Sequence, residues 1–122
     1  MSKNQQVQVL PSAARTATTN SDDMRNARHK GVRVHINVTA ADATPSVVFK
    51  IQGKDNLTGD YFDMLASAAV TATGDTYLRV SPGIAVTANQ TANEQLPSWW
   101  RVVATHADAD ALTYEITADM LV

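Results

Sequence analysis

The segment between His106 and Asp110 holds the tightest group of side chains that could do chemistry. His106, Asp108 and Asp110 offer imidazole nitrogen and carboxylate oxygen, which are ligands for Ca²⁺ or for a transition metal. A Ca²⁺ loop usually brings more oxygen donors and a glycine at its bend, and this segment has neither. We therefore expect a loop whose aspartates accept hydrogen bonds from backbone amides, with no metal and no other cofactor.

Histidines offer a second kind of chemistry, since His29, His35 and His106 could each act as a general base. Such a base needs a nucleophile beside it, and no serine or threonine here has the flanking glycines of a nucleophile elbow. His35 also falls on the polar side of an alternating stretch. We expect surface histidines rather than catalytic ones.

Two further patterns carry less chemistry. Asp22 and Asp23 are adjacent acids, but they lie in a polar stretch where such a pair usually begins a turn. Gly53 and Gly59 are too far apart for a phosphate-binding loop, and the Lys-Ser/Thr of that loop is missing. The sequence therefore predicts no catalytic residue, and an enzyme is the least favoured class.

The tryptophan pair points to binding instead of catalysis. Neighbouring side chains of a strand point to opposite faces, so Trp100 can fill the core while Trp99 and Arg101 lie outside. An exposed tryptophan beside an arginine is typical of protein interface hot spots. Trp99 and Arg101 are therefore candidate interface residues, unless a second sheet or the N-terminal segment covers Trp99 within the same chain.

The elements that must position these residues read as short strands. Valine, threonine and alanine dominate the apolar and small positions while leucine is sparse, which favours strands over helices. Residues 31–39 alternate most clearly between β-branched and polar side chains. The other predicted strands cover residues 5–10 (ended by Pro11), 47–52, 61–65, 67–73, 76–80, 96–105 and 111–117.

The last two of these strands are predicted to pair as one antiparallel hairpin, with residues 106–110 as its loop. The whole pattern amounts to about eight strands at roughly ten-residue spacing. It favours an all-β fold, an antiparallel β-sandwich that is jelly-roll-like. Alternation does not encode the order of pairing, so jelly-roll and immunoglobulin-like arrangements both remain open.

Residues 12–30 have almost no large apolar side chain, so they cannot bury much surface of their own. Residues 12–18 could form an edge strand. Otherwise the segment is predicted to be either an extended N-terminal arm that orders on a neighbouring subunit or a long loop. Its basic residues Arg15, Arg25 and Arg28 are further candidates for an interface.

Length and charge limit the function classes. A chain of 122 residues fits a single domain, 1–122, with one core. The formal charge of −2 gives no field that would recruit nucleic acid. No apolar stretch of signal-peptide or membrane-spanning length occurs, so we expect a soluble, unexported protein without a membrane partner.

Several strings occur here in a familiar order. They are SAARTA (12–17), IQGKD (51–55), LASA (65–68), LRVSPG (78–83), LP (96–97) with WRV (100–102), and THADAD (105–110) leading into LTY (112–114). Together they resemble a family of small virion structural proteins of tailed bacteriophages, over nearly the whole chain. The Ser98-Trp99 pair differs from the polar residues usual before Trp100-Arg101, so an interface at Trp99 would be particular to this protein.

The resemblance implies a structural role, most plausibly as a capsid decoration or cement protein that binds the major capsid protein lattice. It implies a protein made in the host cytoplasm and located on the capsid surface of the virion, as a homo-oligomer for which a trimer is favoured. A head–tail connector or tail protein is one alternative. A surface carbohydrate-binding module is another, with Trp99, Tyr61 and Tyr77 as its aromatic platform.

Overall fold

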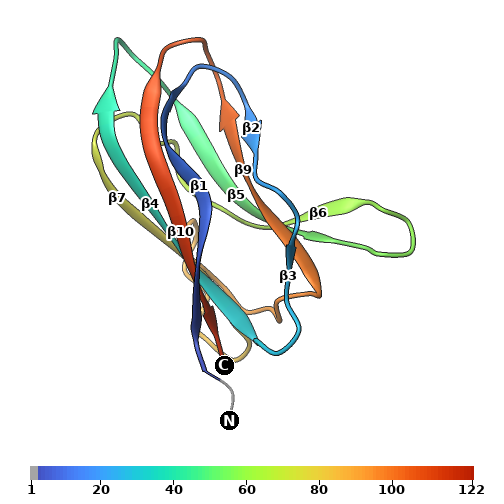
Figure 1. Cartoon of the computed structure of the whole chain (residues 1–122). Coiled ribbons are helices and arrows are strands. Elements are labelled where there is room, and N and C mark those ends of the chain that lie inside the picture. The colour runs from blue at the N-terminus through green and yellow to red at the C-terminus, as the bar shows by residue number, and fades with distance from the viewer. Residues whose placement is uncertain (1–2) are drawn as a thin grey trace.

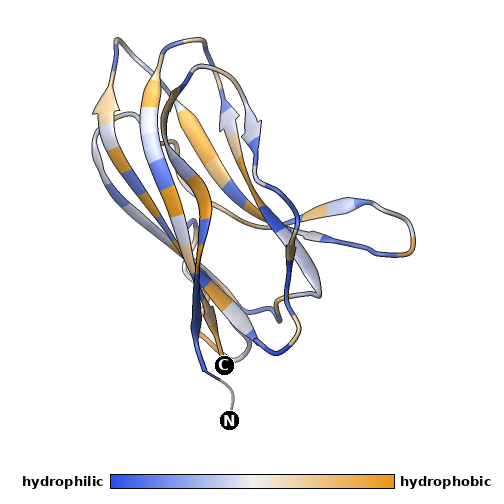
Figure 2. Cartoon of the chain, in the orientation of Figure 1, coloured by the Kyte–Doolittle hydropathy of each residue, from blue (hydrophilic) through white to orange (hydrophobic). Residues whose placement is uncertain are grey.

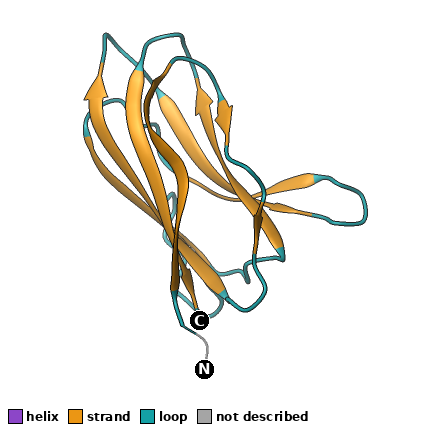
Figure 3. Cartoon of the chain, viewed as in Figure 1, coloured by secondary structure: helices purple, strands orange, loops and turns teal. Residues whose placement is uncertain are grey.

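The computed structural model describes residues 3–122, which form two β-sheets packed face to face (Figure 1). No helix occurs in this range, and loops join the strands at both ends of the sandwich (Figure 3). The predicted all-β sandwich is confirmed. Its strands are β1 (Gln5–Arg15), β2 (Thr19–Asn20), β3 (Met24–Arg25), β4 (Gly31–Ala41), β5 (Val47–Lys54), β6 (Tyr61–Ala66), β7 (Gly74–Val80), β8 (Thr91–Ala92), β9 (Trp99–His106) and β10 (Leu112–Leu121).

The first sheet has the order β1-β10-β4-β7-β8, and the second has β2-β9-β5-β6 with β3 also on β9. Between β2 and β3, Ser21 continues the ladder, because its backbone N–H donates to the Val102 carbonyl and its hydroxyl accepts from the Val102 N–H, both at 2.9 Å. β2 and β3 thus act as one interrupted strand along β9.

The order of these strands is that of a jelly roll. With β2 and β3 taken as one strand and the short β8 set aside, the chain-order numbers are 1-8-3-6 in the first sheet and 2-7-4-5 in the second. Every connection crosses between the sheets except the hairpin from β5 to β6. The sequence left both a jelly-roll and an immunoglobulin-like arrangement open, and the observed strand order is that of the jelly roll.

The predicted hairpin of the last two long strands is wrong. β9 lies in the second sheet between β5 and the β2/β3 edge, whereas β10 lies in the first sheet between β1 and β4. Both strands carry a row of fully buried side chains, and each row must face the opposite sheet. Tyr114 of β10 accordingly packs edge-on against Phe49 of β5, with ring centroids 5.0 Å apart.

The inner faces of the two sheets form one core, and apolar and polar residues alternate along the strands (Figure 2). Trp100 is 0% exposed and lies in this core, while Trp99 and Arg101 on the same strand are only partly buried, as predicted.

Gly53 lies opposite Trp100, and a Cβ on Gly53 would overlap the Phe62 ring and come within 2.9 Å of Pro97. A larger residue at this position would force the Phe62 ring and Pro97 to shift.

Residues 12–30 do not form an arm or a long loop. β1 continues through Pro11 to Arg15, because Pro11 lies in an edge strand where the register with β10 shifts and no ladder donor is needed. The chain then crosses to the second sheet and forms β2 and β3 on β9. This segment buries little apolar surface, and it is held instead by backbone hydrogen bonds at the edge of the second sheet.

Residues 67–73, predicted to be a strand, make only a single bridge, between Val70 and Val47. This stretch leads from β6 in the second sheet to β7 in the first. Its small side chains give it little surface to bury, so it serves as a connection.

Candidate functional site

The hairpin formed by β5 and β6 extends beyond the sandwich and carries the most exposed apolar side chain of the described chain (Figure 1). Leu57, at its tip, is 97% exposed, and Phe62 near its base is 46% exposed. Single exposed apolar residues are ordinary on protein surfaces. What sets this one apart is the structure that presents it.

Hydrogen bonds fix the conformation of the tip, residues 55–60. The Asp55 carboxylate accepts from the backbone N–H groups of Leu57 (2.9 Å) and Thr58 (3.3 Å). The Asp55 carbonyl accepts from the Gly59 N–H at 2.7 Å, and the Asp55 N–H donates to the Asp60 carbonyl at 2.8 Å. Gly59 has φ +80°, which a glycine adopts without strain. Leu57 is therefore held in solvent by a preorganised turn.

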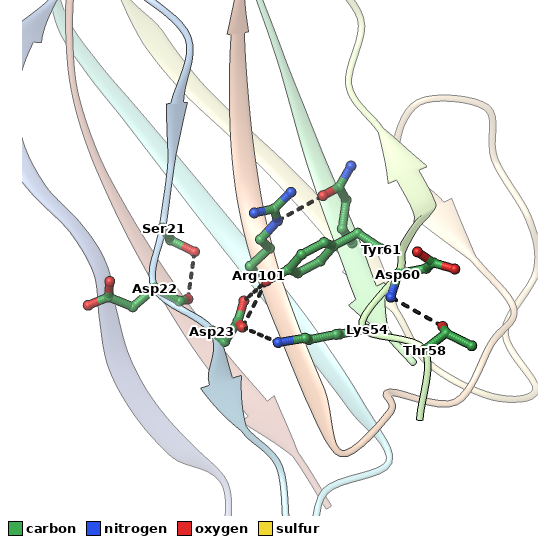
Figure 4. A network of polar contacts seen from close by, with 9 residues as sticks. Ser21, Asp22, Asp23, Lys54, Thr58, Asp60, Tyr61 and Arg101 are labelled. Atoms are coloured by element: carbon green, nitrogen blue, oxygen red, sulfur yellow. Dashed lines mark hydrogen bonds and ion pairs between the residues drawn. The ribbon is translucent and has the colours of Figure 1, made fainter. Parts of the chain in front are cut away.

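Four side chains at the base of the hairpin tie it to the neighbouring strands; we call Asp23, Lys54, Tyr61 and Arg101 the brace (Figure 4). The Tyr61 hydroxyl donates to the Asp23 carboxylate at 2.8 Å, and Lys54 Nζ donates to it at 3.1 Å. The Arg101 guanidinium lies 3.5 Å from the centre of the Tyr61 ring, a close cation–π contact. The brace joins β6 and β5 to β9 and to the residue that precedes β3.

The brace shifts the protonation equilibria of two of its members. The Tyr61 hydrogen bond is the main cause that lowers the pKa of Asp23. Burial opposes it, and Lys54 and Arg101 lower the pKa further. The hydrogen bond to Asp23, and then its charge, raises the pKa of Lys54. Both groups are therefore held in their charged forms, and the ion pair persists at neutral pH.

The polar network continues along the outer face of the second sheet. Arg101 Nε donates to Gln52 Oε1 at 2.9 Å, Gln52 Nε2 donates to Asp63 Oδ1 at 2.7 Å, and Lys50 Nζ lies 3.5 Å from Asp63 Oδ2. These side chains come from β9, β5 and β6. They fix the direction in which the hairpin leaves the sheet.

The structure brings three of the five predicted interface residues together. Trp99 and Arg25 are register partners on β9 and β3, with the Arg25 guanidinium 5.8 Å from the Trp99 ring centre, and Arg101 is two residues along β9. Arg25, from the segment predicted to be an arm, thus covers part of Trp99. From the sequence, such cover was the alternative to an exposed Trp99. Arg28 lies past β3 at the end of the sandwich that holds both termini.

Arg15 lies apart from the other four and is engaged within the chain. Its guanidinium is 4.7 Å from the Tyr114 ring centre and donates to the backbone carbonyls of Pro11, Ala13 and Tyr114. These contacts fasten the end of β1 to β10.

Sequence reasoning missed Leu57, Phe62 and the brace residues Asp23 and Lys54. A single leucine in a polar loop bounded by glycines was a visible signal for the tip. The brace had no such signal, because Asp23 and Tyr61 are far apart in the chain and meet only through the pairing of β3, β9, β5 and β6.

The loop that carries His106 behaves as expected from its aspartates. Asp108 accepts from the Asp110 backbone N–H at 3.0 Å, and Asp110 accepts from the N–H and hydroxyl of Thr44. His106 Nε2 lies 3.0 Å from the Tyr114 hydroxyl. No group of three metal-ligating side chains occurs within residues 3–122.

The other two histidines also contact groups other than a nucleophile. His35 Nε2 lies 2.9 Å from Asp75 Oδ1 and its ring stacks on Tyr77 at 4.6 Å, while His29 Nε2 lies 2.8 Å from the Lys3 carbonyl. Across residues 3–122, no histidine ring is hydrogen-bonded to a serine or threonine hydroxyl.

The three rings suggested for a carbohydrate platform do not share a face. Tyr77 is on the first sheet, whereas Trp99 and Tyr61 belong to the second. Arg101 covers one face of the Tyr61 ring. The platform expected from the sequence is therefore not assembled.

The part of the chain that the structure describes contains no helix of the length and apolar character needed to cross a membrane.

Comparisons with known proteins identify the fold but no family. No family model and no curated protein sequence matches the chain. The crystal structure of PirA is similar with a TM-score of 0.50 and 14% identity, over 98% of this chain and 94% of PirA. A chain in the structure of infectious bursal disease virus, Gx strain, is similar with a TM-score of 0.55 and 6% identity.

That second match covers 96% of this chain but only 32% of the viral chain, so the present chain spans about a third of its length. Identities this low establish a shared fold alone.

Proposed function

We propose that this protein is a non-enzymatic structural protein of a tailed-phage virion that decorates the capsid by binding the major capsid protein lattice. The observation that carries the proposal is the hairpin with Leu57 at its tip, because hydrogen bonds hold this apolar side chain in solvent. The sequence resemblance to phage virion proteins supports the choice of partner. The fold shared with a chain of a virus structure supports it as well.

The hairpin suits this task because its conformation is set before binding. Ordering mobile loops and side chains on binding costs free energy. The Asp55 hydrogen bonds and the brace reduce that cost, because they order the hairpin before it binds. Trp99 and Arg25, near the base, add an aromatic and cationic contact of the kind enriched at interfaces. Weak contacts repeated over a lattice, strengthened by a small symmetric oligomer such as a trimer, would stabilise the shell by mass action.

Binding of purified variants to capsids assembled without this protein tests the contact. We expect Leu57→Asp to weaken binding by about tenfold or more, because it places a charge in an apolar contact. Val86→Asp is the matched control, since Val86 is 68% exposed but belongs to the loop between β7 and β8, outside the hairpin. Equal binding by Leu57→Asp and the wild type would overturn the role given to the hairpin.

Copy number in purified virions tests the location. Hundreds of copies in a fixed ratio to the major capsid protein, measured by quantitative mass spectrometry, are expected of a decoration protein. A handful of copies would favour the connector or tail instead, and absence from the virion would overturn the proposal.

A further inference from the structure

A recess of about 440 Å³ opens at the end of the sandwich that holds the two termini. Three separate parts of the chain line it: the residues around the start of β1, the turn after β3, and the end of β10. Its lining residues are Lys3, Asn4, Gln5, Arg25, Ala27, Arg28, His29 and Met120.

The charged side chains in this lining have one sign. Lys3, Arg25 and Arg28 are cationic, and no aspartate or glutamate belongs to the lining. None of the three forms an ion pair within residues 3–122. The nearest acid along β10, Asp119, is already paired with Arg33 at 3.3 Å. A concave site with uncompensated positive charge concentrates field lines and attracts anions, although the chain as a whole is slightly acidic.

The wall that carries Arg28 is held in place by a buried asparagine. Asn26 Nδ2 donates to the carbonyls of His29 (2.7 Å) and Leu96 (3.1 Å), and Asn26 Oδ1 accepts from the His29 N–H at 2.8 Å. The His29 ring contacts the Lys3 carbonyl, which joins this turn to the start of the chain. The recess is therefore built by the fold and does not depend on mobile side chains alone.

We propose that this recess binds a small multivalent oxyanion, such as a phosphorylated or polycarboxylate molecule. Its volume lies in the range of small-molecule sites, and arginine guanidinium groups pair with phosphate or carboxylate oxygens through two parallel hydrogen bonds. Ala27 and Met120 supply apolar surface for the rest of the ligand. This site shares Arg25 with the proposed capsid contact but does not include the tip of the hairpin, and it does not depend on the proposed role at the capsid.

Isothermal titration of the full chain with pyrophosphate, and separately with citrate, tests the proposal. We expect saturable binding of at least one of them that weakens as sodium chloride is raised. Arg28→Gln should weaken it by about tenfold, while Arg28→Lys, which keeps the charge, should lose less. Arg28 is exposed, so neither substitution threatens folding.

Arg79→Gln is the matched control, because it removes the same charge from the outer face of β7, outside the recess. It should leave binding unchanged. If neither probe binds at a concentration of about 10 mM, which is ten times the dissociation constant of a weak ligand, the proposal is overturned. Equal weakening by Arg79→Gln and Arg28→Gln, or binding of duplex DNA alone, would overturn it too.

Discussion

Tyr61 connects charged groups through two different parts of its side chain. Its hydroxyl donates to Asp23, and its ring face supports the Arg101 guanidinium. The hydroxyl is what holds the Asp23 carboxylate beside Lys54 and lowers its pKa. At the scale of single residues, one phenol group thus links β6 to the residue that precedes β3 and adds to the contacts that orient the hairpin.

Tyr61→Phe should remove the hydrogen bond to Asp23 while keeping the ring under Arg101. We expect a loss of about 1 kcal/mol in the free energy of unfolding, the typical net worth of one such bond. Urea denaturation measures it. Tyr77→Phe is the control, because no hydrogen bond to the Tyr77 hydroxyl occurs within residues 3–122, and it should change stability little. Equal effects of the two substitutions would contradict the role of the hydroxyl.

His106, at the other end of β9 from the brace, should make the free energy of unfolding depend on pH. Burial is the main cause that lowers its pKa below the usual 6.5, with Arg15 acting in the same direction and Asp108 opposing. As the pH falls below 6.5, the unfolded chain takes up a proton that the folded chain resists, so the free energy of unfolding decreases. This contribution is fully present above pH 6.5.

Melting temperature measured against pH tests that sign. The wild type should lose more stability than His106→Gln as the pH falls below 6.5, because the variant has no imidazole at this site. Parallel curves for the two proteins would show that His106 does not contribute. His29 and His35 are present in both proteins, so their titration cancels in the comparison.

At the scale of elements, the β5–β6 hairpin differs from the rest of the molecule. It is the one connection among the eight main strands that stays within a sheet. It also extends beyond the sandwich, so its far end has no opposite sheet to pack on (Figure 1). Local hydrogen bonds at the tip and the brace at the base replace the missing core. An element fixed in this way can project a side chain such as Leu57 without becoming mobile.

Gly59 is the position where this rigidity should be most sensitive. Its φ of +80° is strained for a residue with a Cβ, although open space surrounds it. Gly59→Ala should destabilise by about 1 kcal/mol, and Gly59→Asn by less, because asparagine tolerates the left-handed region better. Faster amide hydrogen exchange at residues 57–59 in the alanine variant would accompany the loss. Similar exchange in all three proteins would contradict this account of the tip.

At the scale of the whole molecule, strands far apart in the chain enclose one core. β1 pairs with β10, and β9 packs between strands from the first half of the sequence. Such a fold closes long loops before its contacts form, which makes folding slow relative to helical proteins of this size. Trp100 lies on β9 between Met24 of β3 and Gly53 of β5 and is completely buried.

The two tryptophans should differ sharply in their contribution to stability. Trp100→Ala removes the largest core side chain and should cost about 3–5 kcal/mol, enough to leave the variant marginally folded. Trp99→Ala should cost about 1 kcal/mol, because it loses a partly exposed ring and its contact with Arg25. Guanidinium denaturation of both variants measures the difference. Comparable losses would mean that Trp99 is as much part of the core as Trp100.

The sequence by itself determined which side of strands such as β4, β5 and β10 is buried. The alternation of Val32, Val34 and Ile36, and the placing of Trp100 inside with Trp99 outside, follow from the two-residue period of a strand, which is a local property. The expected hydrogen-bonded loop at Asp108 and Asp110 is local in the same sense. Such features need no knowledge of the partner strand.

Only the tertiary structure decided which strands pair and which side chains meet. The alternation of apolar and polar residues is the same whether β9 pairs with β10 or faces it across the core. The two strands lie in opposite sheets because the buried side chains of each pack against the other sheet. Pairing along β9 also turned the apolar-poor segment before Gly31 into a sheet edge. The brace and the cationic recess arise from the same long-range pairing, because each collects residues that are distant in the chain and close only after the sheets have packed.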